Sequence, residues 1–256
     1  MNQLESIIDF ALEVGGLMLA SNSEIYRCEQ ITYHVLKAYK VEDINIFTLS
    51  SSIYLTASKQ GETITRIKRV YQSETNLTMI SELNQLSRDI TNYHIPLEEA
   101  KHKLDQIKQI TLPKDILKCL SISFSCVAFG YMFNTFITPV EALAIFIITI
   151  LSYYLTKLLN MGKMNLFIVN FLVANFMTIT TIACYDLNMI RDIDHVIIGT
   201  IMYLVPGVAL TNCIRDMLNG DILSGTVRLV ECLIVGLAIA SGVFVALYLY
   251  KRGGGI

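Results

Sequence analysis

Residues 204–225 have the sequence LVPGVALTNCIRDMLNGDILSG, which lies between two apolar stretches and decides how the second half of the chain folds. Pro206 and Gly207 are expected to break a helix, and a broken membrane helix frees backbone groups that can bind ions or small polar solutes. Arg215 and Asp216 follow in the same stretch, although a charge at the centre of a bilayer costs about 2.5–3.5 kcal/mol on insertion scales. These residues alone allow two interpretations: part of a transport path, or a polar loop with an interfacial ion pair.

Charge is distributed unevenly along the chain. Residues 1–115 contain 12 of the 20 Lys and Arg and 15 of the 22 Asp and Glu, which leaves 8 and 7 for the remaining residues. The chain is 53% hydrophobic, with a mean hydropathy of +0.51. We therefore predict a soluble domain, residues 1–113, fused to a membrane domain, residues 114–256. The net charge of −2 argues against a nucleic-acid partner.

The first 113 residues show the pattern of an α+β domain, with helices packed on a small antiparallel sheet. In chain order we expect helices over 1–20 and 24–40, strands over 44–49, 53–58 and 63–70, and helices from 73–76 to 91 and from 97 to 110. Ser21 or Ser23 is expected to cap the second helix. The first helix is acidic and amphipathic, unlike a signal peptide, so the domain is expected to stay in the cytoplasm.

The membrane domain is expected to be all-α, with about five transmembrane helices. The predicted spans are 116–136, 140–159, 165–184, 195–210 and 226–250, each close to the roughly 20 residues that cross the hydrocarbon. Basic residues are concentrated before the first span and after the second. This asymmetry also predicts a cytoplasmic N-terminal domain on a multi-pass protein of the plasma membrane.

Polar residues also follow one face of the third predicted span. Asn170, Thr178 and Thr181 form a stripe there with small residues between them. Such stripes are typical of helix–helix contacts, and the alternative is a solute path lined by amides and hydroxyls. Glu231, in the last span, and Asp216 are the two carboxylates best placed in the sequence to exchange protons.

The spacing of several motifs resembles the threonine/serine exporter family over nearly the whole chain. The motifs are Pro206-Gly207, Asn212-x-x-Arg215-Asp216, Gly220-Asp221-x-x-Ser224-Gly225, Glu24-x-x-Arg27-x-Glu29, and Asn84-x-x-Ser87-Arg88. Family members usually have glycine where this chain has Asn22. Asparagine is the residue that best replaces glycine in a left-handed turn, so the turn is expected to persist.

The resemblance implies half of a secondary transporter of a bacterium that exports small hydrophilic metabolites, threonine and serine first, by proton exchange. Succinate export is the alternative substrate class. Pro206, Gly207, Asn212, Arg215 and Asp216 would belong to the substrate or proton path. The expected path also includes Asp221, Glu231 and the polar stripe of the third predicted span. A chain with one membrane unit resembles the large subunit of split family members, so we expect a small membrane subunit as partner, or a homo-oligomer.

An enzyme is not expected, although a membrane-tethered hydrolase or a sensor in residues 1–113 is a further alternative. Glu24, Arg27, Glu29 and His34 are the candidate residues for such a site. The sequence has no nucleophile beside a base and no phosphate-binding loop. A salt-bridged helix start is therefore the simpler interpretation of that motif. The six cysteines show no metal-binding spacing, so we expect no catalytic residues, cofactor or metal.

Overall fold

The computed structural model describes residues 3–71, 75–110, 114–133, 137–162 and 164–253. The chain divides into two compact units. The N-terminal unit combines Met1–Leu112 with Val208–Leu229, and the helical unit combines Pro113–Gly207 with Val230–Ile256. The segment quoted at the outset therefore packs mainly with the N-terminal residues, although almost a hundred residues separate the two in the sequence.

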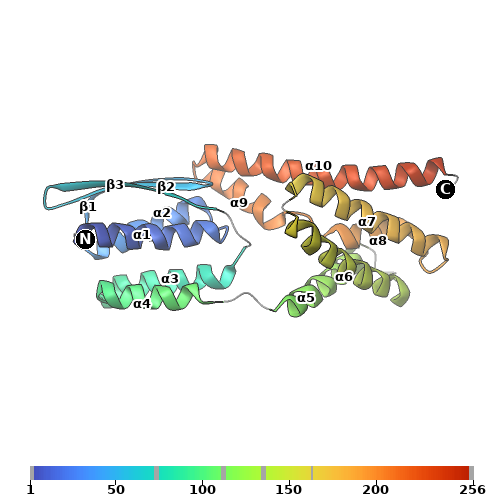
Figure 1. The fold of residues 1–256 in the computed structure, drawn as a ribbon, viewed down its shortest axis with the longest axis horizontal. Coiled ribbons are helices and arrows are strands. Elements are labelled where there is room, and N and C mark those ends of the chain that lie inside the picture. The colour runs from blue at the N-terminus through green and yellow to red at the C-terminus, as the bar shows by residue number, and fades with distance from the viewer. Residues whose placement is uncertain (1–2, 72–74, 111–113, 134–136, 163, 254–256) are drawn as a thin grey trace. The chain divides into compact units, whose positions relative to one another are not determined.

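The N-terminal unit is an α+β structure built on a three-stranded antiparallel sheet in the order β1-β2-β3. Its elements are α1 (Gln3–Ala20), α2 (Ile25–Ala38), β1 (Glu42–Leu49), β2 (Ser52–Lys59), β3 (Glu62–Arg69), α3 (Leu77–Tyr93) and α4 (Leu97–Lys108), joined by most of α9 (Gly207–Leu218) and the first turns of α10 (Ile222–Arg252). Figure 1 shows the sheet, the α1–α2 pair and the α3–α4 pair as three successive layers. The α+β prediction for this part of the chain matches the observed elements.

Two local turns follow directly from the sequence. Gln60 and Gly61 both have positive φ, 54° and 82°, as expected for a two-residue hairpin loop between antiparallel strands. Asn22 has φ 62°, which confirms the left-handed turn predicted between the first two helices.

The core lies between the layers: α1 is buried on most of its surface, and Ile53, Leu55 and Ala57 of β2 face it.

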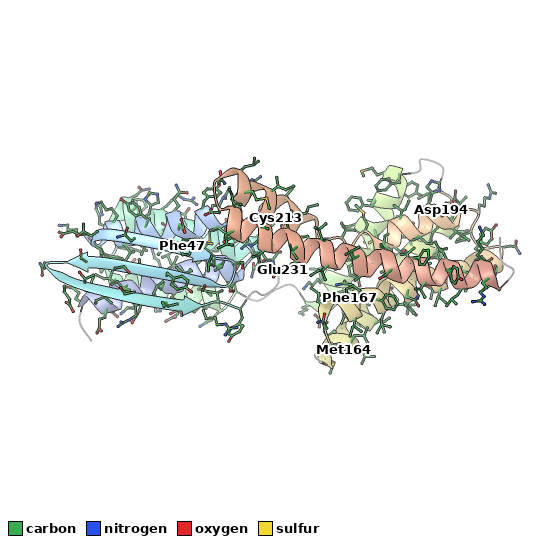
Figure 2. All side chains as sticks on the ribbon, turned by 90° about the horizontal axis from the view of Figure 1, so that it is seen from above. Phe47, Met164, Phe167, Asp194, Cys213 and Glu231 are labelled. Atoms are coloured by element: carbon green, nitrogen blue, oxygen red, sulfur yellow. The ribbon has the colours of Figure 1, made fainter. Side chains whose placement is uncertain are left out.

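The opposite face of the sheet carries exposed apolar residues. Phe47 of β1, labelled in Figure 2, pairs with Tyr54 of β2, and Tyr54 pairs with Ile67 of β3. The sheet therefore buries one face against α1 and α2 and presents an apolar row on the other.

The helical unit contains α5 (Asp115–Phe133), α6 (Pro139–Met161), α7 (Leu166–Asp186), α8 (Ile193–Ile201) and the remainder of α10. Among the described residues, α5, α6, α7 and α10 are long and apolar enough to cross a membrane. Residues 134–136, which end the first predicted span, lie outside the described residues. Thr138 and Glu141 form a capping box that starts α6, which fixes the beginning of the second span.

The predicted count of five spanning helices is not confirmed. The fourth predicted span, 195–210, is divided between α8 and α9, and no helix is assigned from residue 202 to 206. The helix break predicted at Pro206 is therefore present. The 9 residues of α8 extend only about 13 Å at 1.5 Å per residue, which is less than half of a hydrocarbon core of roughly 30 Å.

Candidate functional site

The candidate site lies in the N-terminal unit, where the helical hairpin of α9 and α10 meets the start of α2. The hairpin turns at Gly220, whose φ of 99° favours glycine because other residues rarely adopt it. Gly225 lets the two helices approach closely, since a Cβ atom there would lie 2.8 Å from the backbone oxygen of Cys213. Cys213 is buried on α9, where Figure 2 labels it. This packing brings polar residues of α9 and α10 together.

Asp216 is the centre of the cluster and is fully buried. Its Oδ1 accepts a hydrogen bond from the backbone N–H of Ile25 at 2.9 Å, and its Oδ2 accepts from Nη1 of Arg228 at 2.9 Å. Ile25 is the first residue of α2, so the carboxylate occupies a helix N-terminus, where negative charge is stabilised. The residue before it, Glu24, makes no side-chain cap.

The prediction that Ser21 or Ser23 caps α2 is therefore wrong. The N-cap residue is Glu24, and the free N–H group of Ile25 is satisfied by Asp216 instead. The physical reason is that a carboxylate from a distant helix reaches the N-terminus of α2. No pattern local to residues 21–25 could have indicated it.

Arg228 is the second buried member of the cluster, and its Nη1 also donates to the backbone oxygen of Ser23 at 3.2 Å. Nε and Nη2 of Arg228 are buried and have no hydrogen-bond partner among the residues that the structure describes. A planar guanidinium can bind a carboxylate through two parallel N–H groups. Nη1 holds Asp216, and the chemistry of the remaining donors suits one more carboxylate group.

Four further side chains surround the buried pair. Glu24 is buried and forms ion pairs with Arg27, three residues along its own helix, and with Arg215 of α9. The side chains of Arg27 and Arg215 are 45% and 54% exposed, so they form the solvent-facing edge of the cluster. Asn212 of α9 donates from Nδ2 to the backbone oxygen of Asn22 at 2.9 Å.

Burial alters the proton affinity of three carboxyl groups in this region. The pKa of Asp216 is raised by burial, against the lowering effects of the Ile25 N–H and of Arg228. Burial also raises the pKa of Asp221. The pKa of Glu29 is raised by burial as well, although the backbone N–H of Thr48 donates to its Oε1 at 2.8 Å. These groups accept a proton more readily than ordinary carboxylates do.

Several residues predicted from the sequence meet here, and others do not. Glu24, Arg27, Asn212, Arg215 and Asp216 form one cluster within the N-terminal unit. Glu29 lies on α2 but bonds to Thr48 of β1. Asp221 lies in the turn between α9 and α10, and Pro206 and Gly207 lie at the break between α8 and α9.

The polar stripe and Glu231 belong to the helical unit. Asn170, Thr178 and Thr181 are buried on α7, and each donates to the carbonyl oxygen four residues earlier in the same helix. Glu231 is exposed on α10 (Figure 2).

Sequence reasoning did not identify Arg228 as a site residue. A signal was available, because Arg228 is a basic residue within the otherwise uncharged run 222–230. Its partner could not be read from the sequence, since Asp216 precedes it by 12 residues across a helix turn. In the described part of the chain, no group of three His, Cys, Asp or Glu side chains is placed to hold a metal ion.

A small α+β unit followed by long apolar helices defines the chain as a multi-pass membrane protein with a folded N-terminal region. The chain belongs to the threonine/serine exporter family, because the family model described as "Putative threonine/serine exporter" matches residues 9–250. This match confirms the resemblance predicted from the motifs, and it makes the chain a member of a transporter family.

Relatives of known name fall into two groups. The chain is 24% identical to the "Probable succinate transporter subunit YjjP" of Klebsiella aerogenes, over 99% of this chain and 97% of that protein. It is 22% identical to the protein of the same name from Escherichia coli, over 98% of both chains. It is also 22% identical to the "Probable threonine/serine exporter" of Mycobacterium tuberculosis, over 94% of this chain and 46% of that protein. No solved structure matches the chain.

Proposed function

We propose that the chain is a subunit of a secondary transporter that exports small hydrophilic metabolites carrying a carboxylate group, driven by proton exchange. The observation that carries this proposal is the buried Asp216–Arg228 pair with further donors on Arg228. Membership of a transporter family supports the general class. The chemistry of the pair supports the finer assignment.

The pair supplies a simple exchange of partners. In the described conformation Asp216 is the counter-charge of Arg228. When a substrate carboxylate binds the guanidinium, a proton taken up by Asp216 keeps one positive and one negative charge in the buried site. When the substrate leaves, Asp216 releases the proton and pairs again with Arg228. Because this step carries substrate and proton together, export driven by proton exchange also requires a second carboxylate to carry protons in the opposite direction, and Glu231 is the candidate. Burial favours this cycle because it raises the pKa of Asp216 and makes an uncompensated charge costly.

The remaining predicted residues fit secondary roles in the same path. Pro206 and Gly207 interrupt the helix between α8 and α9, as in transporters whose broken helices bind solutes. Asn212, Arg215 and Asp221 would guide a polar solute at the edge of the cluster. In the helical unit, Glu231 would exchange protons, and the stripe of Asn170, Thr178 and Thr181 would offer hydroxyl and amide oxygens.

Two substrate classes are supported by different observations. The family description and the Mycobacterium relative favour threonine and serine. The two relatives that match along nearly their entire length are named as succinate transporter subunits. Both classes carry a carboxylate that Arg228 could bind, so the buried pair accommodates either one. We keep threonine and serine as the first candidates and succinate as the second.

The assembly and the orientation are also proposals. The word "subunit" in the names of two relatives supports a partner, either a small membrane subunit with a second membrane unit or further copies of this chain. We propose that residues 1–113 form a cytoplasmic domain and residues 114–256 a membrane domain. The location would be the plasma membrane of a bacterium, as the distribution of basic residues favours.

The proposal is tested by efflux of radiolabelled threonine, serine and succinate from loaded bacterial cells. The chain is expressed with and without a candidate small membrane subunit, and membrane content is measured by immunoblot. Arg228→Gln should abolish efflux of the transported substrate, and Arg228→Lys should retain a fraction, because lysine keeps the charge without the planar fork. The control is Arg69→Gln, because the side chain of Arg69 is exposed on β3. Efflux by Arg228→Gln at the rate of the control would contradict the assignment.

A further inference from the structure

A polar pocket lies in the N-terminal unit, between one face of α2 and one face of α3. Its volume is about 310 Å³. Arg27, Gln30 and His34 of α2 line one side, and Asn84, Ser87 and Arg88 of α3 line the other. The α2 residues are spaced by three, four and seven positions, and Ser87 and Arg88 follow Asn84 by three and four positions, so each set lies on one helix face. The two N-terminal motifs that carry the family resemblance thus meet at one pocket.

The pocket has an excess of positive charge. Arg27 and Arg88 are its charged residues, and its described lining contains neither Asp nor Glu. The guanidinium of Arg88 donates from Nε and Nη2 to Oε1 of Gln85, at 3.1 and 2.7 Å. Gln85 is neutral, so these two hydrogen bonds do not neutralise the charge of Arg88. Arg27 does have a counter-charge, Glu24, but Glu24 is shared with Arg215.

We propose that this pocket binds a small anion through its carboxylate or phosphate oxygens. Two arginines on facing helices match two oxygen atoms of such a group. The amides of Gln30 and Asn84 and the hydroxyl of Ser87 supply neutral hydrogen-bonding groups around them. A volume of about 310 Å³ is at the small end of ligand pockets and suits a compact metabolite. This binding site is separate from the transport role proposed above, because none of the lining residues belongs to α9 or α10.

The anion would act on the buried cluster through Arg27. Arg27 and Arg215 bind the same carboxylate, Glu24. An anion that takes Arg27 as its partner weakens one of these two ion pairs and leaves Glu24 to Arg215 of α9. The pocket would therefore report the concentration of a cytoplasmic anion to the α9–α10 hairpin within the same unit.

The test is direct binding to the purified full-length chain in lipid nanodiscs, measured by calorimetry with sodium succinate, L-threonine and inorganic phosphate. We expect at least one of these probes to bind, and its identity separates a carboxylate metabolite from phosphate. Arg88→Gln should weaken that binding about tenfold or more, because a charge-assisted hydrogen bond is lost. The matched control Arg69→Gln should leave it unchanged.

Hydrogen exchange places the binding on the chain. The bound probe should slow exchange in residues 27–34 and 84–88, and Arg88→Gln should remove this protection. Because Arg88 is exposed, its replacement should leave the fold intact, which circular dichroism checks. Binding of no probe, or equal binding to Arg88→Gln and wild type, would overturn the proposal. Neither result depends on whether the chain transports the probe.

Discussion

The buried ion pair of the N-terminal unit and the polar stripe of α7 are both polar groups inside apolar surroundings, but their hydrogen bonds differ. The hydroxyls of Thr178 and Thr181 donate to carbonyl oxygens of their own helix. Asp216 depends instead on the N-terminus of α2 and on Arg228 of α10. Replacing a polar side chain that hydrogen-bonds within its own helix should have only a local effect. Replacing one member of a pair that joins three helices should disturb the packing of all three.

The largest effect is expected from Asp216→Ala, which leaves Arg228 as an uncompensated buried charge. The loss should lower the free energy of unfolding of the N-terminal unit by about 3–5 kcal/mol. Thermal unfolding of the detergent-solubilised chain can be followed with a thiol-reactive dye. Cys28 and Cys213 are buried, and burial raises the pKa of Cys28 to about 12, so these two thiols should react slowly until the N-terminal unit unfolds. The melting temperature should fall by several degrees.

The control for this effect is the double variant Asp216→Leu with Arg228→Met. Removing both charges should recover part of the lost stability, because no unpaired charge remains buried. If Asp216→Ala melts within about one degree of wild type, the pair does not hold the three helices together.

A smaller effect is expected from Gly225→Ala, which tests how closely α9 and α10 must pack around the pair. The added methyl group would lie 2.6 Å from Cγ of Met217 and 2.8 Å from the backbone oxygen of Cys213. Overpacking of this kind costs about 1–3 kcal/mol. Gly236→Ala on the same helix is the matched control, since a Cβ atom there meets nothing within 4 Å. Equal melting temperatures for the two variants would refute the close packing.

Asp221 should add its own pH-dependent contribution to stability, which a substitution at this residue isolates. Because burial raises its pKa above the ordinary 3.8, the folded chain binds this proton more tightly than the unfolded chain does. Its contribution to stability is therefore present below pH 3.8 and is lost as the pH rises through the raised pKa. Asp221→Asn should be more stable than wild type at neutral pH, by less than about 1 kcal/mol. Melting curves from pH 4 to 8 should show this difference disappear on acidification.

The smallest effect is expected from Thr178→Val in the α7 stripe. Valine has nearly the same shape as threonine, and the lost hydroxyl donates to Ala174 within the same helix. Side-chain hydrogen bonds between membrane helices average only about 0.6 kcal/mol, and this bond lies within a single helix, so the melting temperature should change little. A loss as large as that of Asp216→Ala would show that the stripe depends on partners outside its helix.

The local parts of this structure could be predicted from the sequence. The turn at Asn22, the hairpin at Gln60 and Gly61 and the helix break at Pro206 each follow from the backbone preferences of a few adjacent residues. The fourth predicted span was not confirmed because apolar composition alone does not show that α8 ends at Ile201.

The candidate site could be predicted only in part. The charged residues of the Arg215–Asp216 and Glu24–Arg27 motifs were recognisable, but not their contact. Ile25 and Asp216 are 191 residues apart, and only the folded N-terminal unit brings them together. The serines near α2 were reasonable caps by local rules. The carboxylate of Asp216 binds the N-terminus of α2 instead, and it also binds Arg228.

The central claim is that Asp216 exchanges a proton while Arg228 exchanges its carboxylate partner. The most direct measurement compares two modes of transport by Asp216→Asn in proteoliposomes, with the partner subunit if efflux requires one. Asparagine keeps an Oδ1 acceptor for the N–H of Ile25 but cannot release a proton. The account predicts that exchange of labelled for unlabelled substrate continues, while export driven by a pH gradient is lost. Export driven by the pH gradient at the wild-type rate in Asp216→Asn would contradict it.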